Sequence, residues 1–158
     1  MALATYTVAV NAAFLQEIKE DHHELRQLMH HTGAMFDRPD WMPAEIDQLA
    51  TLLGKLRDQL AMHFSLEEAF GYFEDAIESA PHLSRRAEDL RAQHATLYAI
   101  LCRLAERCER LFHDKPVDDV LAALAADYRH FAAGFADHES QESELIVEAF
   151  NSDIGAGD

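Results

Sequence analysis

The sequence has few residues that interrupt helices and little positive charge. Its 158 residues contain only six glycines and four prolines, which favours long helices. Lysine and arginine total 13 against 29 aspartate and glutamate residues, so the formal net charge is −16. An acidic surface of this kind repels nucleic acid and anionic lipid. We therefore expect neither a nucleic acid nor a membrane among the partners.

Long apolar runs and paired cysteines are also missing from the sequence. No apolar stretch reaches the roughly 20 residues that a membrane-spanning helix needs. The stretch MALATYTVAVNAAF lacks the basic region of a signal peptide, so we do not expect one. Cys102 and Cys108 lie on different sides of one predicted helix and cannot bridge each other. Free thiols are typical of a reducing compartment, which predicts a cytoplasmic location.

What the chain does have is helical periodicity. Apolar residues make up 49% of it and recur at alternating steps of three and four in four segments. Each segment therefore has one side that faces a common core. These core-facing positions are Leu15, Ile18, His22, Leu25, Met29, Thr32 and Phe36; Ile46, Leu49, Leu53, Leu56, Leu60, His63 and Glu67; Leu83, Ala87, Leu90, His94, Leu97, Leu101, Leu104, Cys108 and Leu111; and Leu124, Tyr128, Phe131, Phe135, His138, Glu142 and Leu145.

The links between these segments are short and contain proline. They read DRPDWMP, SAPHLS and HDKP, and Pro43 suits the first turn of the second helix. Short links between long helices indicate antiparallel neighbours. The sequence therefore predicts an all-α fold, an up-down-up-down antiparallel four-helix bundle over residues 11–150. Residues 1–10 are expected to form an N-terminal extension and residues 151–158 a flexible C-terminal tail.

Six of the core-facing positions carry ionisable side chains. They are His22, His63, Glu67, His94, His138 and Glu142. Each segment contributes one histidine, and the second and fourth add a glutamate four residues later, on the same side of the helix. The same periodicity selects Glu67 over Glu68, and Glu142 over Glu139 and Glu144. The order of residues nearly repeats between the two halves of the chain, which predicts matching sets around a pseudo-two-fold axis.

A metal site explains why ionisable groups would be buried together. Burying unpaired carboxylates costs several kcal/mol each. A lone core histidine is usually just a hydrogen-bonded core residue, but six positions in phase favour divalent cations. Two glutamates can bridge two metals, and two histidines can complete each protein shell. Nitrogen and oxygen donors suit iron, manganese or zinc. The remaining histidines lie off the core side or in loops and are expected to be solvated: His23, His30, His31, His82, His113 and His130.

Four motifs in this order resemble the hemerythrin-like family, also called the HHE cation-binding domain. They are DHHEL, HFSLEE, QHATL and HESQE, and the resemblance covers about residues 12–150. It implies a non-haem di-iron centre in the bundle, two iron ions with an oxo or hydroxo bridge and two carboxylate bridges. It also implies a small-molecule partner, dioxygen or a related molecule such as NO or peroxide.

The sequence departs from the oxygen-carrying hemerythrins in one respect. The carriers have a further histidine four residues from the one on the third helix, and an aspartate five residues after the last histidine. Here Leu90 and Tyr98 flank His94 at that spacing, and the acid after His138 is Glu142, four residues on. Four histidines instead of five favour reduction of O2 or peroxide, NO binding, sensing or iron handling over simple carriage. Tyr98 is either a group that could hydrogen-bond a bound ligand or a core tyrosine.

The residues leave several functions open. One is a module that binds or senses O2 or NO, and another is an oxidase, peroxidase or NO reductase that uses an external reductant. A structural zinc site is a third, because the same ligands accept zinc. A ferritin-like carboxylate centre would need two Glu-x-x-His motifs in the core. Glu20 and His23 have that spacing, but both lie off the core side of their helix.

Overall fold

The computed structural model describes residues 20–38, 43–69, 78, 80–113 and 118–156. Every secondary-structure element in these ranges is helical, which confirms the all-α prediction. The elements are a helical segment at residues 20–36, α2 (Pro43–Ala69), the short 3-10 helix η1 (Pro81–Leu83), α4 (Ser84–His113) and α5 (Asp118–Ala156). The expected N-terminal extension, residues 1–10, lies outside the described residues.

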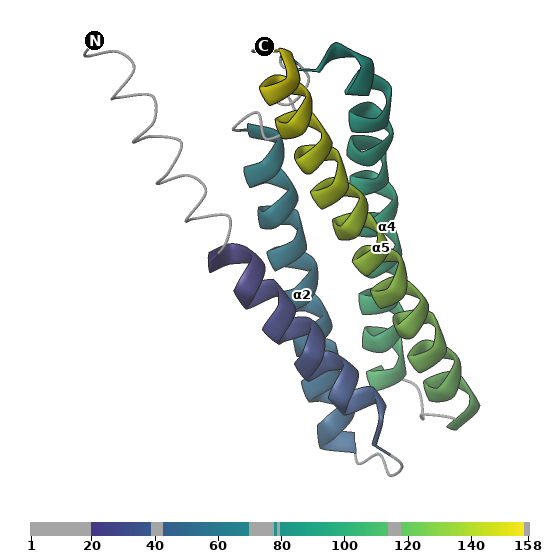
Figure 1. Ribbon diagram of the computed structural model, residues 1–158. Coiled ribbons are helices and arrows are strands. Elements are labelled where there is room, and N and C mark those ends of the chain that lie inside the picture. Colours follow the sequence, from purple (N-terminus) through teal and green to yellow (C-terminus); the bar gives the residue numbers. More distant parts are fainter. Residues whose placement is uncertain (1–19, 39–42, 70–77, 79, 114–117, 157–158) are drawn as a thin grey trace.

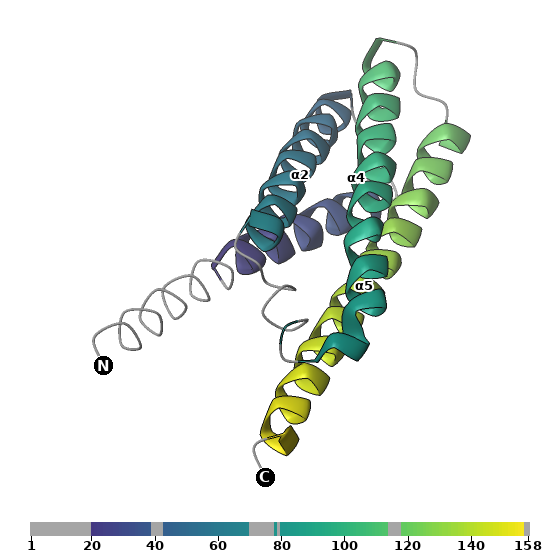
Figure 2. The same ribbon diagram turned by 90° about the horizontal axis from the view of Figure 1, so that it is seen from above.

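The helices form an antiparallel four-helix bundle with up-down-up-down topology, as predicted (Figure 1). α4 packs against both α2 and α5, and the view from above shows α4 and α5 running alongside each other (Figure 2). Hydrogen bonds connect the 20–36 segment to α2 and α5. Gln59 of α2 donates to Asp21 at 2.6 Å, and Tyr128 of α5 donates to the carbonyl of Met29 at 2.6 Å.

Two helix boundaries follow the proline signals. Pro43 opens α2, where its missing N–H would have had no partner anyway. Pro81 opens η1, which leads directly into α4 at Ser84. α5 continues through Ala156, so most of the segment expected to form a flexible C-terminal tail, residues 151–156, is helical. None of the described helices combines the length and the apolar character that crossing a membrane would require.

The core consists of two apolar clusters with a polar layer between them. On α4, Leu90 belongs to the smaller cluster and Leu97 to the larger one, with His94 between them. On α5, Phe135 belongs to the larger cluster and Leu145 to the smaller one. Burying a leucine or phenylalanine in either cluster stabilises the fold by about 1.5–3 kcal/mol. The two apolar clusters thus hold the backbone on both sides of the polar layer and fix its geometry.

Candidate metal centre

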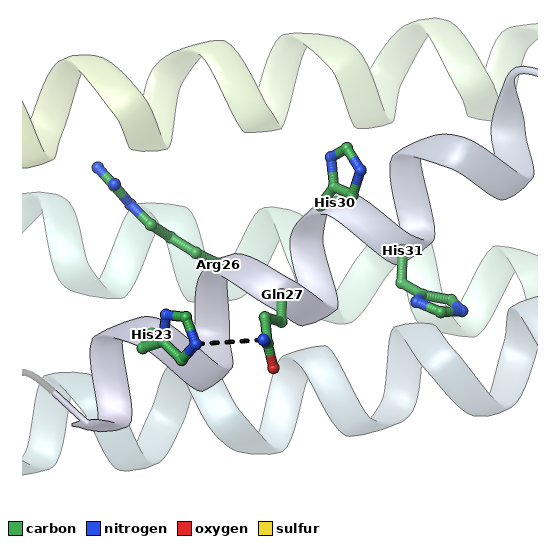
Figure 3. A pocket seen from close by; sticks show the side chains of 5 residues that line it. All are labelled: His23, Arg26, Gln27, His30 and His31. Carbon is green, nitrogen blue, oxygen red and sulfur yellow. Dashed lines mark hydrogen bonds between the residues drawn. The ribbon is translucent and has the colours of Figure 1, made fainter.

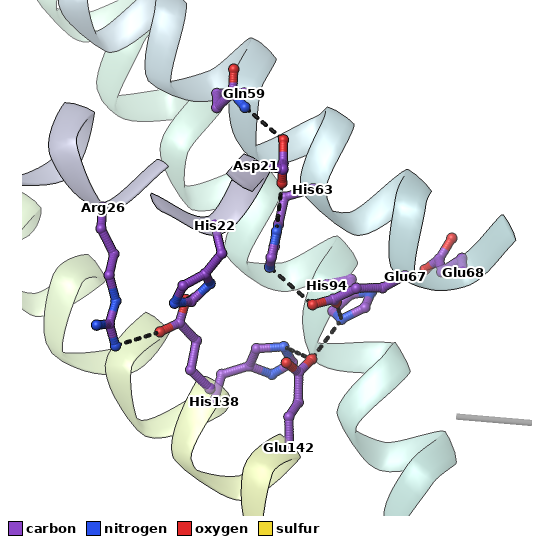
Figure 4. A network of polar contacts seen from close by, with 11 residues as sticks. Asp21, His22, Arg26, Gln59, His63, Glu67, Glu68, His94, His138 and Glu142 are labelled. Atoms are coloured by element: carbon purple, nitrogen blue, oxygen red, sulfur yellow. Dashed lines mark hydrogen bonds and ion pairs between the residues drawn. The ribbon is translucent and has the colours of Figure 1, made fainter. Parts of the chain in front are cut away.

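The polar layer brings together side chains from each helix of the bundle (Figure 4). The N-terminal helical segment supplies His22, α2 supplies His63 and Glu67, α4 supplies His94, and α5 supplies His138 and Glu142. The last five are buried, with 1–5% of their surface exposed, and His22 is half-buried. The predicted side chains therefore lie in one layer, as the helical periodicity required.

One group in this layer is fully buried. Glu67, His94, His138 and Glu142 each offer a ligand atom, and these atoms lie within 4.8 Å of one another. Nε2 of His94 lies 3.3 Å from Glu67 Oε2 and 3.2 Å from Glu142 Oε1. Nε2 of His138 lies 2.6 Å from the same Glu142 oxygen. Two imidazoles and two carboxylates thus converge in a space that can hold a cation.

A second group lies beside the first. His22, His63 and Glu139 also offer ligand atoms within 4.8 Å of one another. Nδ1 of His22 lies 3.3 Å from Glu139 Oε1, and the rings of His22 and His63 are 5.6 Å apart. Glu67 connects the two groups, because its Oε1 lies 2.9 Å from His63 Nε2. In a dinuclear site each group would bind one cation, and a carboxylate in contact with both groups could bridge the two cations.

Hydrogen bonds from outside the layer orient three of the histidines. Nδ1 of His63 donates to Asp21 at 2.7 Å, and Nδ1 of His138 donates to the Gln93 amide oxygen at 2.8 Å. Nδ1 of His94 lies 3.1 Å from a Glu68 oxygen. In each ring Nδ1 is held from the outside and Nε2 points at the carboxylates of the layer. This arrangement is typical of metal-binding histidines, whose second nitrogen is held by a hydrogen-bond acceptor.

The ionisable side chains of the layer shift one another's pKa values. Burial lowers the pKa of His63, but the carboxylates of Glu67 and Asp21 outweigh it and raise the pKa to about 9. Burial also lowers the pKa of His94, and the glutamates around it raise the pKa to about 9. Burial raises the pKa of Glu67, but its contacts with the imidazoles of His63 and His94 outweigh burial and lower the pKa. The imidazoles and carboxylates of the layer thus favour each other's charged forms.

In the second group, at the edge of the layer, the pKa values of His22 and Glu139 shift in the opposite directions. Burial, the charge of His63 and that of Arg26 all lower the pKa of His22. Burial raises the pKa of Glu139, and the charge of Arg26 only partly opposes this. The imidazole of His22 is therefore kept in the neutral form that binds metal.

Hydrogen bonding within the layer is incomplete. In the described part of the chain, the buried side-chain atoms without a hydrogen-bond partner are Glu67 Oε2, His138 Nε2 and Glu139 Oε1. Each approaches a neighbour in the layer without the alignment of a hydrogen bond. Buried polar atoms are rarely left in this state, since it costs free energy. All three atoms are of types that bind iron, manganese or zinc, so the residues fit a pair of cations.

Aromatic rings close the layer on the side of the larger apolar cluster. Phe64 stacks on His94 with ring centroids 4.0 Å apart and an angle of 6° between the ring planes. Phe135 packs against both His63 and His138, with ring centroids 6.3 and 6.4 Å away. These contacts restrict rotation of the imidazoles and exclude water from that side.

The prediction that Glu139 lies off the core side was wrong. Its side chain is only 14% exposed, and its carboxylate reaches His22 and Arg26 of the N-terminal helical segment. The periodicity test assumes one narrow face on each helix. α5 instead presents His138 towards α4 and Glu139 towards the 20–36 segment. Glu68 and Glu144 are exposed, as the same test predicted.

Other residues that hold the layer were not identified from sequence. Asp21 and Gln93 each precede a predicted ligand histidine, and Glu68 follows a predicted ligand glutamate. Their position directly beside a candidate ligand was the available signal. Which histidine each one contacts depends on packing between helices.

Tyr98 lies on the outside of the bundle and not in the polar layer. Its side chain is 37% exposed, and a hydrogen bond to Cys102 raises its pKa. This placement gives no support to a role in binding a ligand at the centre, and it is not that of a core tyrosine. Cys102 and Cys108 are both free thiols, as predicted.

Histidines off the core side are solvated wherever the structure describes their side chains. His23, His30, His31, His82 and His130 are exposed, and the side chain of His113 lies outside the described residues. Figure 3 shows three of them beside Arg26 and Gln27, around a shallow pocket on the outer face of the 20–36 segment. His23 and Gln27 are 3.1 Å apart. The choice of His22 over its neighbour His23 therefore agrees with the placement of the two side chains.

Comparison with known proteins identifies the family. Searches of curated proteins and of solved structures gave no match. The family described as "Hemerythrin HHE cation binding domain" matches residues 13–151, which contain the whole polar layer. The match covers most of the chain and agrees with the helical bundle and with the buried histidine and glutamate groups. The chain belongs to the hemerythrin HHE cation-binding domain family.

Proposed function

We propose that the protein is a non-haem di-iron protein that binds O2 or a related small molecule, NO or peroxide. The site is a carboxylate-bridged dinuclear centre, and its role lies in sensing or handling oxygen, NO or iron. The metal ligands proposed from the sequence are His22, His63, Glu67, His94, His138 and Glu142. One observation carries the proposal: Nδ1 of each of three histidines is held from outside, while Nε2 faces a shared set of carboxylates.

The donor set supports iron, manganese or zinc over softer metals. It contains imidazole nitrogens and carboxylate oxygens, and neither cysteine belongs to the groups that could hold a cation. Iron in such a site would supply the redox chemistry and the open positions for a small ligand. The chain itself orients the imidazoles through Asp21 and Gln93, and it excludes water with Phe64 and Phe135. The free thiols support a cytoplasmic location as part of the same proposal.

An enzyme with an external reductant is the second candidate, and the third helix favours it. At the positions one turn from His94, Leu90 is buried in an apolar cluster and Tyr98 is exposed. α4 therefore supplies a single histidine to the polar layer, and one metal would keep a position open for an exchanging ligand. An open position favours turnover of O2, NO or peroxide over storage.

Metal analysis combined with optical spectroscopy tests the proposal. We expect two iron ions per chain after purification with iron, and absorption changes when O2, NO or peroxide is added. Bands that reverse on removal of O2 indicate binding or sensing, whereas consumption of NO or peroxide with a reductant indicates an enzyme. A colourless protein that contains only zinc would reject both redox functions and leave a structural site.

A further inference from the structure

We propose that Glu139 is a seventh protein ligand, which binds the metal held by His22 and His63. The inference rests on the proposed dinuclear site and adds to it. Glu139 does not belong to the pattern of histidines and glutamates four residues apart, because it directly follows His138. It would give the second group a carboxylate of its own beside the shared Glu67.

The geometry around Glu139 supports this assignment. Its Oε1 is buried, lies 3.3 Å from His22 Nδ1 and has no hydrogen-bond partner. That oxygen and one ligand atom each of His22 and His63 lie within 4.8 Å of one another. A buried carboxylate oxygen without a partner is costly, and a cation between it and the two imidazoles would remove that cost.

The contact with Arg26 does not explain the burial of Glu139. Arg26 Nη2 lies 3.7 Å from Glu139 Oε2, and the arginine side chain is 69% exposed. An exposed ion pair at this distance is weak, and it leaves the other carboxylate oxygen unpaired. Arg26 contacts only the outer oxygen, Oε2, while the inner oxygen, Oε1, lies 3.3 Å from the imidazole of His22.

Glu139 also makes the two groups chemically different. The first group offers two imidazoles and two carboxylates, and the second offers two imidazoles and Glu139. Because Glu67 contacts His63 as well, it can serve both cations. The second cation would lie nearer the surface than the first, because His22 is half-buried whereas the residues of the first group are all buried.

Stepwise titration of the metal-free protein with Co2+ tests the role of Glu139. Absorption of bound Co2+ reports both stoichiometry and ligand environment. We expect two Co2+ per wild-type chain. In Glu139→Gln the second Co2+ should bind at least tenfold more weakly, with an altered spectrum, because a charged ligand is lost. Glu144→Gln, at an exposed position of the same helix, is the matched control and should behave as wild type.

The outcomes separate this inference from the function on which it rests. Two Co2+ bound to Glu139→Gln with wild-type affinity and spectrum would overturn the role of Glu139 and leave the dinuclear site intact. A wild-type chain that binds fewer than two Co2+ would overturn both. If Glu139→Gln does not fold, as judged by circular dichroism, Glu139→Asp keeps the charge and should still change the spectrum and affinity of the second Co2+. An unchanged titration of Glu139→Asp would then count against the assignment.

Discussion

The two halves of the chain place different residues at equivalent positions around the polar layer. In the first half, the residue after the α2 histidine is Phe64, which stacks on His94 of the other half. In the second half, the residue after the α5 histidine is Glu139, which contacts His22 of the other half. In both halves, the residue after the histidine therefore contacts a histidine of the other half. Phenylalanine makes the His94 side dry and closed, whereas glutamate makes the His22 side polar and more open.

A second pair of equivalent positions differs in charge. Asp21 precedes His22 and accepts the hydrogen bond of His63, and Gln93 precedes His94 and accepts that of His138. Both hold Nδ1 at nearly the same distance, 2.7 and 2.8 Å. The aspartate carries a charge that makes its imidazole more basic, and the glutamine does not. A repeated sequence pattern therefore fixes geometry, and the individual residues decide how each half binds a cation.

Removing Glu67 should break the centre in both halves at once. Its carboxylate contacts His63 and His94, so Glu67→Ala deprives both groups of a ligand. We expect loss of both metals by elemental analysis. The metal-dependent rise in melting temperature should also disappear, since metal saturation at 100 times Kd stabilises a fold by about 2.7 kcal/mol. His22→Ala should remove only one metal, and Glu144→Ala none. Two metals retained in Glu67→Ala would contradict the shared carboxylate.

Phe64→Ala should show how much the closed side contributes to stability. Phe64 is 5% exposed and packs on His94 and Phe135. Truncation of a buried phenylalanine typically costs about 3–5 kcal/mol. We expect a loss of that size in urea unfolding of the metal-free protein. Met62→Ala, at a position 56% exposed on the same helix, should change the free energy of unfolding by less than about 0.5 kcal/mol. Equal effects of the two substitutions would mean that the Phe64 side is not closed.

Exchanging the acceptors should reverse the difference between the halves. Asp21→Asn keeps an acceptor but removes its charge, and Gln93→Glu adds a charge at the equivalent position. Changes in such outer contacts alter metal affinity by about 10–100-fold. We expect Asp21→Asn to weaken the metal held by His63 and Gln93→Glu to strengthen the metal held by His138. The measurement is the pair of stepwise Co2+ affinities of each variant. Unchanged affinities in both variants would show that the two acceptors only position the rings.

These positions also show how far the sequence predicts the structure. Leucine spacing predicted the bundle, because the apolar face of a helix can be identified from the sequence of that helix alone. The same spacing identified His63 and Glu67, which point straight into the core. Glu139 was missed because α5 faces two neighbours, and its position between them depends on how the helices cross. Neither alternative for Tyr98 matches its exposed position, although Glu67 at the same four-residue spacing from His63 is buried. Which of two such positions is covered depends on how the neighbouring helices pack.

The pH dependence of stability should have opposite signs with and without metal, and this is the smallest expected effect. Without metal, the folded-state pKa values of His63 and His94 are raised from 6.5 to about 9. Their contribution to stability is fully present below pH 6.5 and is lost as the pH rises through about 9. Glu67 has a lowered pKa, so its contribution is present above its ordinary value of 4.5 and is lost on acidification. The metal-free protein should therefore unfold more easily at pH 9 than at pH 6.5.

A bound cation should reverse this slope between pH 6.5 and 9. Metal ligation needs deprotonated imidazoles, so each cation displaces protons from the layer and binds more tightly as the pH rises. Melting temperatures of the metal-free and Zn2+-loaded protein should diverge across this range, and protons should be released into weakly buffered solution when Zn2+ is added at pH 7. His130→Ala removes an exposed histidine away from the layer and should leave both slopes unchanged. Parallel pH profiles with no proton release would mean that imidazolium ions and carboxylates simply neutralise each other, as in an ordinary buried ion-pair network.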